Sequence, residues 1–339
     1  MKEDNGNKSG PGRIYFFRSE SATSTVIGAV LLLAIVFSVF SIVRIGYIPE
    51  WKSDAEYSHM DDVWEDMADL KSKIDMMSIV LASNPNSSYL NSSDPDSSSP
   101  QLVMSVPFHM GGGSIPLIGS IKSSGTLAVN KDPCIMSIIV NPDSDSGHYF
   151  KSINCGTVTY NSQNRYYVDQ VFSYEGGALI LGQREQSAMM LYPSIRFSRT
   201  SANEYNVTIN AVRIFEKEYY PPDVISSNSG CSLSLAGLDY KPLYDSDRDN
   251  FGNIESFILT IYTLNPEAWE QYLEKTIDDT GIDPGEYTLV SSESSNSVRL
   301  TFPSTSDSTK TKEASTPDIL KRLYVSETVV KAEPGIGLN

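Results

Sequence analysis

The chain has 339 residues, enough for one large or two ordinary domains that fold around hydrophobic cores without disulfide staples. Asp and Glu number 42 against 26 Lys and Arg, so the net charge is −16; with no local basic patch, nucleic acid is excluded as an expected partner. Apolar residues make up 40% of the chain and Tyr outnumbers Phe by 19 to 12, which indicates an ordered, β-rich protein and excludes wholesale disorder.

The first predicted element is a membrane anchor helix at residues 22–48. Residues 26–43 carry no charge, and at about 1.5 Å per residue they span roughly 27 Å, close to the hydrocarbon thickness of a bilayer. A buried core helix is the weaker alternative, and so is a cleaved secretory signal, because Arg44 and Tyr47 follow where a small-residue cleavage site would lie. The residues expected to form the anchor include Val26, Ile27, Gly28, Leu31, Leu32, Leu33, Ile35 and Val36.

A basic leader, residues 1–21, precedes the anchor. Residues 1–25 contain four basic and three acidic residues, whereas the rest of the chain contains 22 basic and 39 acidic residues. Because Lys and Arg favour the cytoplasmic side of a membrane, we expect a single-pass cell-membrane protein with a cytoplasmic amino terminus. Everything beyond about residue 47 is then extracytoplasmic.

Residues 21–35, SATSTVIGAVLLLAI, resemble the amino-terminal signature of archaeal type IV pilins and pilin-like proteins with class III signal peptides. The resemblance implies that a prepilin-type peptidase cuts on the cytoplasmic side and that the apolar helix serves first as membrane anchor and then as filament core. The processing region implied by the resemblance contains Arg18, Ser19, Glu20, Ser21 and Ala22. Glu20 departs from the family pattern, which has a basic residue and Gly near the cut.

A second helix, the amphipathic stalk at residues 49–83, is predicted from apolar residues that recur at spacings of three and four. These residues are Met60, Val63, Met67, Leu70, Ile74, Met77 and Leu81. Pro49 is expected to start or kink the helix, because proline lacks a backbone N–H and clashes with the preceding turn. The stripe packs either on the protein's own head or on helices of neighbouring subunits; the head is favoured, because Met specifies a coiled coil poorly.

A surface linker is expected at residues 84–100, where Ser, Asn and Pro dominate and neither helix nor strand is favoured. The sequence motif for N-glycosylation occurs twice in this linker and once further on. The candidate glycosylation sites on an exported chain are Asn86, Asn91 and Asn206.

The head, residues 101–339, is predicted to be an antiparallel β-sandwich with one short helix, so that the fold class of the chain is α+β. The helix is expected to begin at Asn265 and Pro266 and to end near Gly281. The strands expected are residues 102–108, 126–129, 135–140, 166–172, 178–181, 194–197, 205–215, 254–262, 287–290, 298–302 and 323–330.

Residues suited to catalysis are scarce in this sequence, and no enzyme activity is predicted. The three His residues lie outside any metal-binding motif, and no nucleophile motif occurs. Three cysteines, Cys134, Cys155 and Cys231, allow at most one disulfide and leave the pairing open.

One acidic segment is a candidate metal site. Alternating carboxylates at Asp245, Asp247 and Asp249 are suited to Ca²⁺, the one candidate cofactor. A solvated loop is the favoured alternative, because Arg248 lies among them and the spacing of an EF-hand is not met.

The function predicted from these features is that of an archaeal pilin-like, membrane-anchored surface protein acting in filament assembly or surface attachment. Its expected partners are the lipid bilayer, a prepilin-type peptidase, and pilin-like subunits or cell-surface components. The alternative is a single-span envelope protein that never polymerises and whose head binds a ligand or an envelope component. An anchored hydrolase would require distant acidic residues to converge in a cleft.

Overall fold

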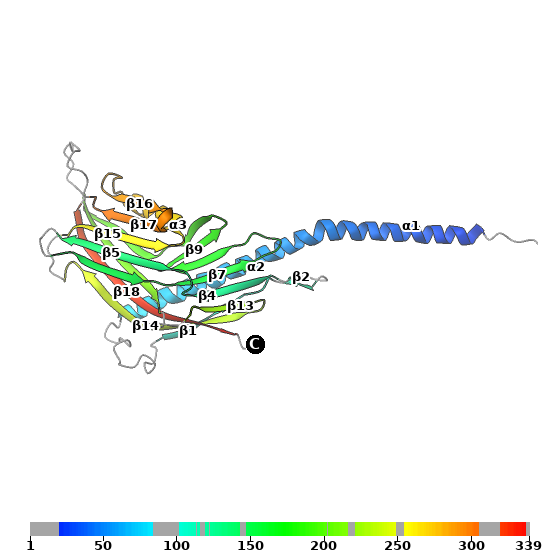
Figure 1. Cartoon of the computed structure of the whole chain (residues 1–339), viewed down its shortest axis with the longest axis horizontal. Helices are drawn as coiled ribbons and strands as arrows, with labels where there is room; N and C mark the ends of the chain where they lie inside the picture. Colours follow the sequence, from blue (N-terminus) through cyan, green and yellow to red (C-terminus); the bar gives the residue numbers. More distant parts are fainter. Residues whose placement is uncertain are drawn as a thin grey trace, which may run out of the picture. The chain divides into compact units, whose positions relative to one another are not determined.

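The computed structural model describes residues 20–83, 102–112, 114–115, 119–121, 123–142, 147–201, 203–215, 221–248, 254–304 and 319–336. The chain divides into two compact units, Met1–Trp51 and Lys52–Asn339. The first contains the predicted anchor, and the second contains the stalk helix together with a β-rich head (Figure 1). The predicted α+β class is confirmed.

The first unit is helical throughout its described part. Helix α1 covers Glu20–Ile42, a π-helical turn covers Val43–Tyr47, and α2 begins at Ile48. The N–H of Ile48 donates to the carbonyl of Val43, five residues back, and Pro49 has no N–H to donate. The irregularity expected at Pro49 therefore takes the form of a π turn directly before it.

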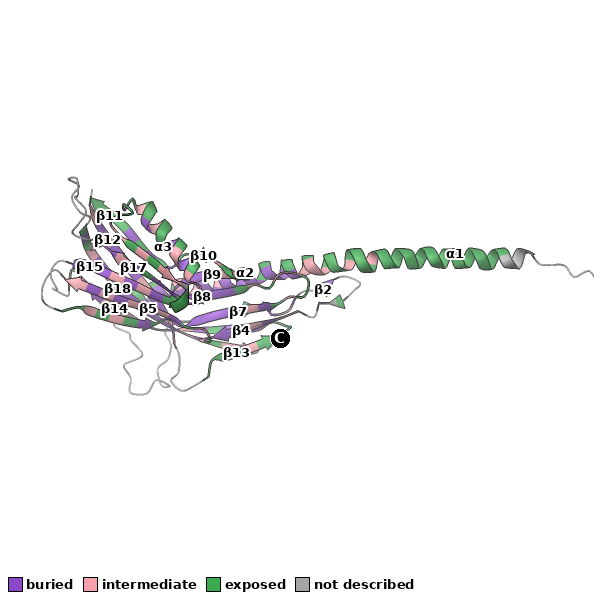
Figure 2. Cartoon of the chain, turned by 45° about the horizontal axis from the view of Figure 1, so that its top comes forward, coloured by how far each residue is buried: buried purple, intermediate pink, exposed green. Residues whose placement is uncertain are grey.

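Helix α2, Ile48–Ser83, packs along the head through the stripe that the sequence predicted (Figure 1). All seven predicted stripe residues are at most 3% exposed. Packing on the protein's own head, the favoured interpretation, is confirmed. Figure 2 shows the contrast with α1, which is exposed along its described length.

In the described residues of the head, the strands form three large sheets. Sheet 1 contains, in spatial order, β1 (Leu102–Phe108), β14 (Cys231–Asp245), β18 (Ile319–Ile336), β12 (Glu204–Ile214) and β11 (Ser194–Ser201). Sheet 2 contains β10 (Gln186–Leu191), β9 (Ala178–Gln183), β8 (Val171–Glu175), β7 (Thr157–Gln163), β4 (Ser124–Val129) and β13 (Asp223–Ser227). Sheet 3 contains β16 (Thr288–Ser292), β17 (Ser297–Phe302), β15 (Ile254–Thr263), β5 (Cys134–Pro142) and β6 (Tyr149–Asn154).

Smaller elements complete the head. They are the ribbon of β2 (Ser114–Ile115) and β3 (Gly119–Ser120), the helix α3 (Pro266–Thr280) and a 3-10 turn at Glu293–Ser295. Helix α3 begins and ends where the sequence predicted, with Gly281 in the left-handed conformation at φ 75°.

Two hydrophobic cores lie on opposite faces of β12. Tyr205, Val207 and Ile209 point into a first core with sheet 3 and α3, whereas Val212 and Ile214 point into a second core with α2 and sheet 2. Successive side chains of a strand alternate between its two faces, so β12 separates the two cores. Sheet 1 thus supports the stalk helix on one face and sheet 3 on the other.

The strand predictions were wrong in two respects. Residues 166–170, expected to be strand, form a loop before β8, and the strands β2, β3, β6, β7, β10, β13 and β14 were not predicted. All strand pairs that the structure describes are antiparallel except β12 with β18, which run parallel from Glu204 opposite Ile319 to Ile214 opposite Val330.

Candidate functional site

The side chains of the predicted anchor residues in α1 are exposed. The seven large apolar residues predicted for the anchor are 42–66% exposed, and an 18-residue window of the helix has a mean hydropathy of 3.0 with none of it buried. Apolar surface of this extent is unfavourable in water and favourable in lipid. By length and composition, α1 is compatible with a single-pass membrane anchor, whereas its orientation stays a prediction.

The predicted processing region meets the beginning of α1. Glu20 is the first residue of the helix, and Ser21 and Ala22 belong to its first turn. Arg18 and Ser19 lie outside the described residues. Cleavage in this region stays a prediction.

A buried carboxylate on α2 fastens the stalk helix to the head. Glu56 is fully buried, and its Oε2 accepts hydrogen bonds from the backbone N–H groups of Arg165 at 3.1 Å and of Tyr166 and Tyr167 at 2.7 Å. Its Oε1 accepts only from Arg165, also at 3.1 Å. Three consecutive N–H groups that converge on one carboxylate form an anion-binding nest. The sequence signal was weak, because Glu56 is one of many acidic residues between residues 49 and 83.

Two further polar residues of α2 point into the same interface. Asp66 Oδ2 lies 2.7 Å from the backbone N and 2.9 Å from Nδ1 of His109, and His59 Nε2 lies 3.2 Å from the hydroxyl of Tyr160. Burial raises the pKa of Asp66 and lowers the pKa of His59, because each group loses hydration of its charged form. Both histidines therefore have structural partners.

A second buried carboxylate, Glu175, lies beneath α3. It accepts hydrogen bonds from the side chains of Thr263, Trp269 (2.7 Å), Asn265 (3.3 Å) and Ser173 (3.3 Å). Burial raises the pKa of Glu175, while these four donors act in the opposite direction. Asn265, predicted as the N-cap of α3, makes no side-chain capping bond, because its amide is directed to Glu175.

A cleft of about 960 Å³ lies at the amino-terminal end of α3. Asn265, Glu267 and Glu270 of the helix face Arg184 and Glu185 of the turn between β9 and β10 across it. The charged residues of the lining are mainly acidic, with Asp169, Glu185, Glu267 and Glu270 against Arg184, and they lie among neutral polar and apolar residues. Such a lining is better suited to a cationic or hydroxylated ligand than to an apolar one.

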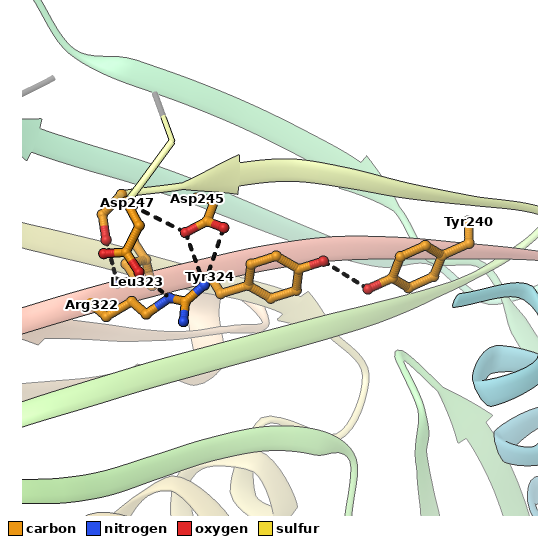
Figure 3. Close-up of polar contacts among 7 residues, drawn as sticks. Tyr240, Asp245, Asp247, Arg322, Leu323 and Tyr324 are labelled. Atoms are coloured by element: carbon orange, nitrogen blue, oxygen red, sulfur yellow. Dashed lines mark hydrogen bonds and ion pairs between the residues drawn. The ribbon is translucent and has the colours of Figure 1, made fainter. Parts of the chain in front are cut away.

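The acidic segment predicted as a calcium site is held by an arginine from a distant strand (Figure 3). Arg322 Nη2 lies 3.2 Å from Oδ2 and 3.3 Å from Oδ1 of Asp245, and Arg322 Nε lies 3.1 Å from Oδ2 of Asp247. The backbone N–H of Asp247 also donates to Asp245 at 3.2 Å. Arg322 therefore compensates both carboxylates at the end of β14.

The calcium prediction has two outcomes in the structure. Asp245 and Asp247 are brought together as predicted, whereas Asp249 lies outside the described residues. Among the residues with described placement, no group of three or more His, Cys, Asp or Glu side chains could hold a metal ion. Calcium binding stays a prediction, and the arginine is a competitor that the sequence did not reveal.

Of the candidate glycosylation sites, the structure describes Asn206 and does not describe Asn86 and Asn91. Asn86 and Asn91 lie outside the described residues. Asn206 lies on β12 between β11 and β18, and its Oδ1 is buried. Use of the three sites stays a prediction.

Comparison with known proteins gave no relative of the chain. No protein-family model matches it, and neither a curated protein nor a solved structure is significantly similar to it.

Proposed function

We propose that this chain is a membrane-anchored, pilin-like surface protein that acts in filament assembly or surface attachment and has no catalytic role. The single observation that carries the proposal is the division of the amino-terminal helical region. Its first part, α1, is apolar and exposed on all sides, whereas α2 from Lys52 onward is built into the head. A helix that is apolar all round requires lipid or other helices as its surroundings.

The division agrees with what the resemblance of residues 21–35 to archaeal pilins implies. In that family the amino-terminal helix is the membrane anchor and later the filament core. The stripe of α2 is buried within the chain, so α1 presents most of the exposed apolar helical surface of the described residues to other subunits.

A second candidate is a single-span envelope protein that never polymerises and whose head binds a ligand or envelope component. The even distribution of apolar residues around α1 favours it, because such a helix is suited to lipid on every side. The cleft at the amino-terminal end of α3 is the place in the head where such a ligand is expected.

Location is tested first. The full chain should partition with membranes and require detergent, whereas a chain that begins at Lys52 should be soluble and folded, because Lys52–Asn339 is a compact unit with its own cores. Protease added to intact cells should digest the head of the full chain. A head that is digested only after cell lysis would contradict the extracytoplasmic location.

Processing and polymerisation are tested next. Amino-terminal sequencing of protein from native membranes and from sheared surface material should find a chain that begins between Ser19 and Ala22. Protein that begins at Met1 would contradict the pilin proposal and favour the second candidate.

Subunit contacts can be mapped with one introduced cysteine, because the three native cysteines are buried. In a filament, Leu33→Cys in α1 should form cross-linked dimers, and Asp61→Cys on the exposed face of α2 is the matched control. Dimers from neither position, with the protein confined to the membrane fraction, would support the non-polymerising candidate.

A further inference from the structure

Two of the three cysteines lie where the chain crosses between sheets 2 and 3. Cys134 is the first residue of β5, after the connection from β4, and Cys155 lies between β6 and β7. The chain enters sheet 3 at Cys134 and leaves it after Cys155. The two crossings lie side by side.

Hydrogen bonds hold the two crossings together. The N–H of Cys155 donates to the carbonyl of Cys134 at 2.8 Å, and the N–H of Asn130 donates to the carbonyl of Thr157 at 2.8 Å. The Thr157 hydroxyl donates to the carbonyl of Asp132 at 2.9 Å. These contacts fix the backbone on both sides of the cysteine pair.

Gly156 shows how closely the crossings approach. Its φ of +64° is in the left-handed region, and a Cβ at this position would lie 2.1 Å from Oδ1 of Asn130. Only glycine fits there without a shift of the neighbour. The placement of Cys155 next to it is therefore tightly determined.

The cysteines face each other across neighbouring strands. Ile135 is opposite Asn154, so the antiparallel register places Cys134 opposite Cys155. Directly opposite residues that share backbone hydrogen bonds have Cα atoms about 5.5 Å apart, within the range that a disulfide requires.

The surroundings single out this pair. Both cysteines are 0% exposed in the first core, whereas Cys231 belongs to the second core. The pKa of the Cys134 thiol is raised by a side-chain hydrogen bond with Cys155 and, to a smaller extent, by burial. Cys134 and Cys155 therefore share one core, and Cys231 lies in the other.

We propose that Cys134 and Cys155 form a disulfide in the mature protein and that Cys231 stays a thiol. The inference rests on the proposed extracytoplasmic location, where disulfides persist. The oxidant is a small-molecule or protein disulfide. One cysteine thiolate attacks it and releases one thiol, and the second cysteine attacks the mixed disulfide, forms the Cys134–Cys155 bond and releases the other thiol.

The exchange takes place before the core closes. In the folded head both sulfurs are shielded from solvent, and the raised pKa of Cys134 suppresses its thiolate. The same burial protects the finished bond from reductants. The expected result is a structural disulfide that links the two segments in which the chain passes between sheets 2 and 3.

The test uses the full chain from native membranes, denatured and alkylated without reduction, then digested and analysed by mass spectrometry. The expected result is a linked Cys134–Cys155 peptide, two hydrogens lighter than its parts, together with alkylated Cys231. Alkylation of all three cysteines, or a link that includes Cys231, would overturn the proposal.

Refolding of the reduced full chain in detergent with oxidised and reduced glutathione separates the pairing from the location. If the Cys134–Cys155 bond forms in this refolding but is absent from native protein, the disulfide proposal is wrong because the native location of the head does not support the bond. A pair that forms in neither case overturns it through its geometry, and the protease experiment then decides the location independently.

Matched variants complete the experiment. Cys231→Ser should keep the linked peptide, and its thermal midpoint should fall by about 5–10 °C when the bond is reduced under denaturing conditions and the protein refolded. Cys134→Ala/Cys155→Ala should show no effect of reductant. If the double variant does not fold, the peptide analysis of Cys231→Ser still decides, because it is made on denatured protein.

Discussion

Replacement of Glu56 by Gln and by Ala should destabilise the head by clearly different amounts. Oε2 accepts all three loop N–H groups, and Oε1 shares only that of Arg165. A Gln side chain can place its carbonyl oxygen where Oε2 lies and keep the three donors. It loses the charge and one shared bond, whereas Ala leaves all three N–H groups without their acceptor.

The magnitudes follow from the type of hydrogen bond. A bond to a charged acceptor contributes about 1.5–3 kcal/mol and a neutral one about 0.5–1.5 kcal/mol, so each of the three bonds loses about 1 kcal/mol and Glu56→Gln should cost about 3 kcal/mol. An unsatisfied donor costs about 1–3 kcal/mol, so three of them cost about 6 kcal/mol together; because Arg165 and Tyr166 are exposed and water can replace part of the acceptor, Glu56→Ala should cost about 5 kcal/mol.

The assay is urea unfolding of the full chain in detergent, followed by tryptophan fluorescence. Glu65 is the matched control, because it is an exposed glutamate on the same helix. Its Gln and Ala variants should change the unfolding free energy by no more than about 0.5 kcal/mol. Hydrogen exchange of the amides of residues 165–167 should accelerate in Glu56→Ala alone.

Two results would refute this reasoning. Equal losses for Glu56→Gln and Glu56→Ala would mean that the three N–H groups are not satisfied by one oxygen. A loss for Glu56→Ala no larger than that for Glu65→Ala would mean that the loop does not fasten α2 to the head.

Three further predictions concern packing, pH and calcium. Met77→Ala should lower the free energy of unfolding by about 2–5 kcal/mol, because Met77 is 0% exposed. Its neighbour Met76 is 50% exposed, so Met76→Ala should change that free energy by no more than about 0.5 kcal/mol. Equal urea midpoints for the two variants would contradict the packing of α2. Because burial raises the pKa of Glu175, the folded protein keeps this proton to higher pH than the unfolded chain does. Wild-type stability relative to Glu175→Gln should therefore be greatest below the ordinary carboxyl pKa and fall as pH rises through the folded pKa, and a flat difference in thermal midpoint would contradict it. Because Arg322 pairs with Asp245 and Asp247, the melts with millimolar Ca²⁺ and with chelator should be identical, whereas a Ca²⁺-dependent rise in midpoint that is lost in Asp247→Ala/Asp249→Ala would establish a site.

The sequence revealed those elements whose pattern is set within a few turns. The stripe of α2 and the uncharged run of α1 depend only on the helical period and on length, and both were found with nearly the observed bounds. Helix α3 was also found, because Pro266 and Gly281 mark its ends locally.

Elements that depend on distant partners were missed. Residues 166–170 have aromatic and β-branched side chains typical of a strand, but Glu56 accepts hydrogen bonds from the N–H groups of Arg165, Tyr166 and Tyr167, which lie in a loop. Strand β14 was not predicted, because Gly237 and Pro242 are residue types that strands disfavour. Gly237 is explained by the stalk helix, because a Cβ there would lie 3.2 Å from Leu81 Cδ1.

The candidate calcium segment illustrates the same limit for a site. Alternating Asp residues are visible locally, and their pattern predicts a cation. The cation that the structure places there is the guanidinium of Arg322, 77 residues from Asp245 in the sequence. Only the pairing of β14 with β18 brings them together.

The contacts of α1 decide between the two functional candidates, the pilin-like filament subunit and the single-span envelope protein. The α2 stripe is buried within the chain, and most of the exposed large apolar residues on the described helices belong to α1, whose surface associates in plain water whatever its role. Within lipid, the hydrophobic effect no longer drives helices together, so contacts there report specific packing. Oligomers seen in detergent-free buffer therefore say nothing about filaments, whereas cross-links at Leu33→Cys in native membranes or sheared surface material distinguish a polymerising subunit from a solitary anchor.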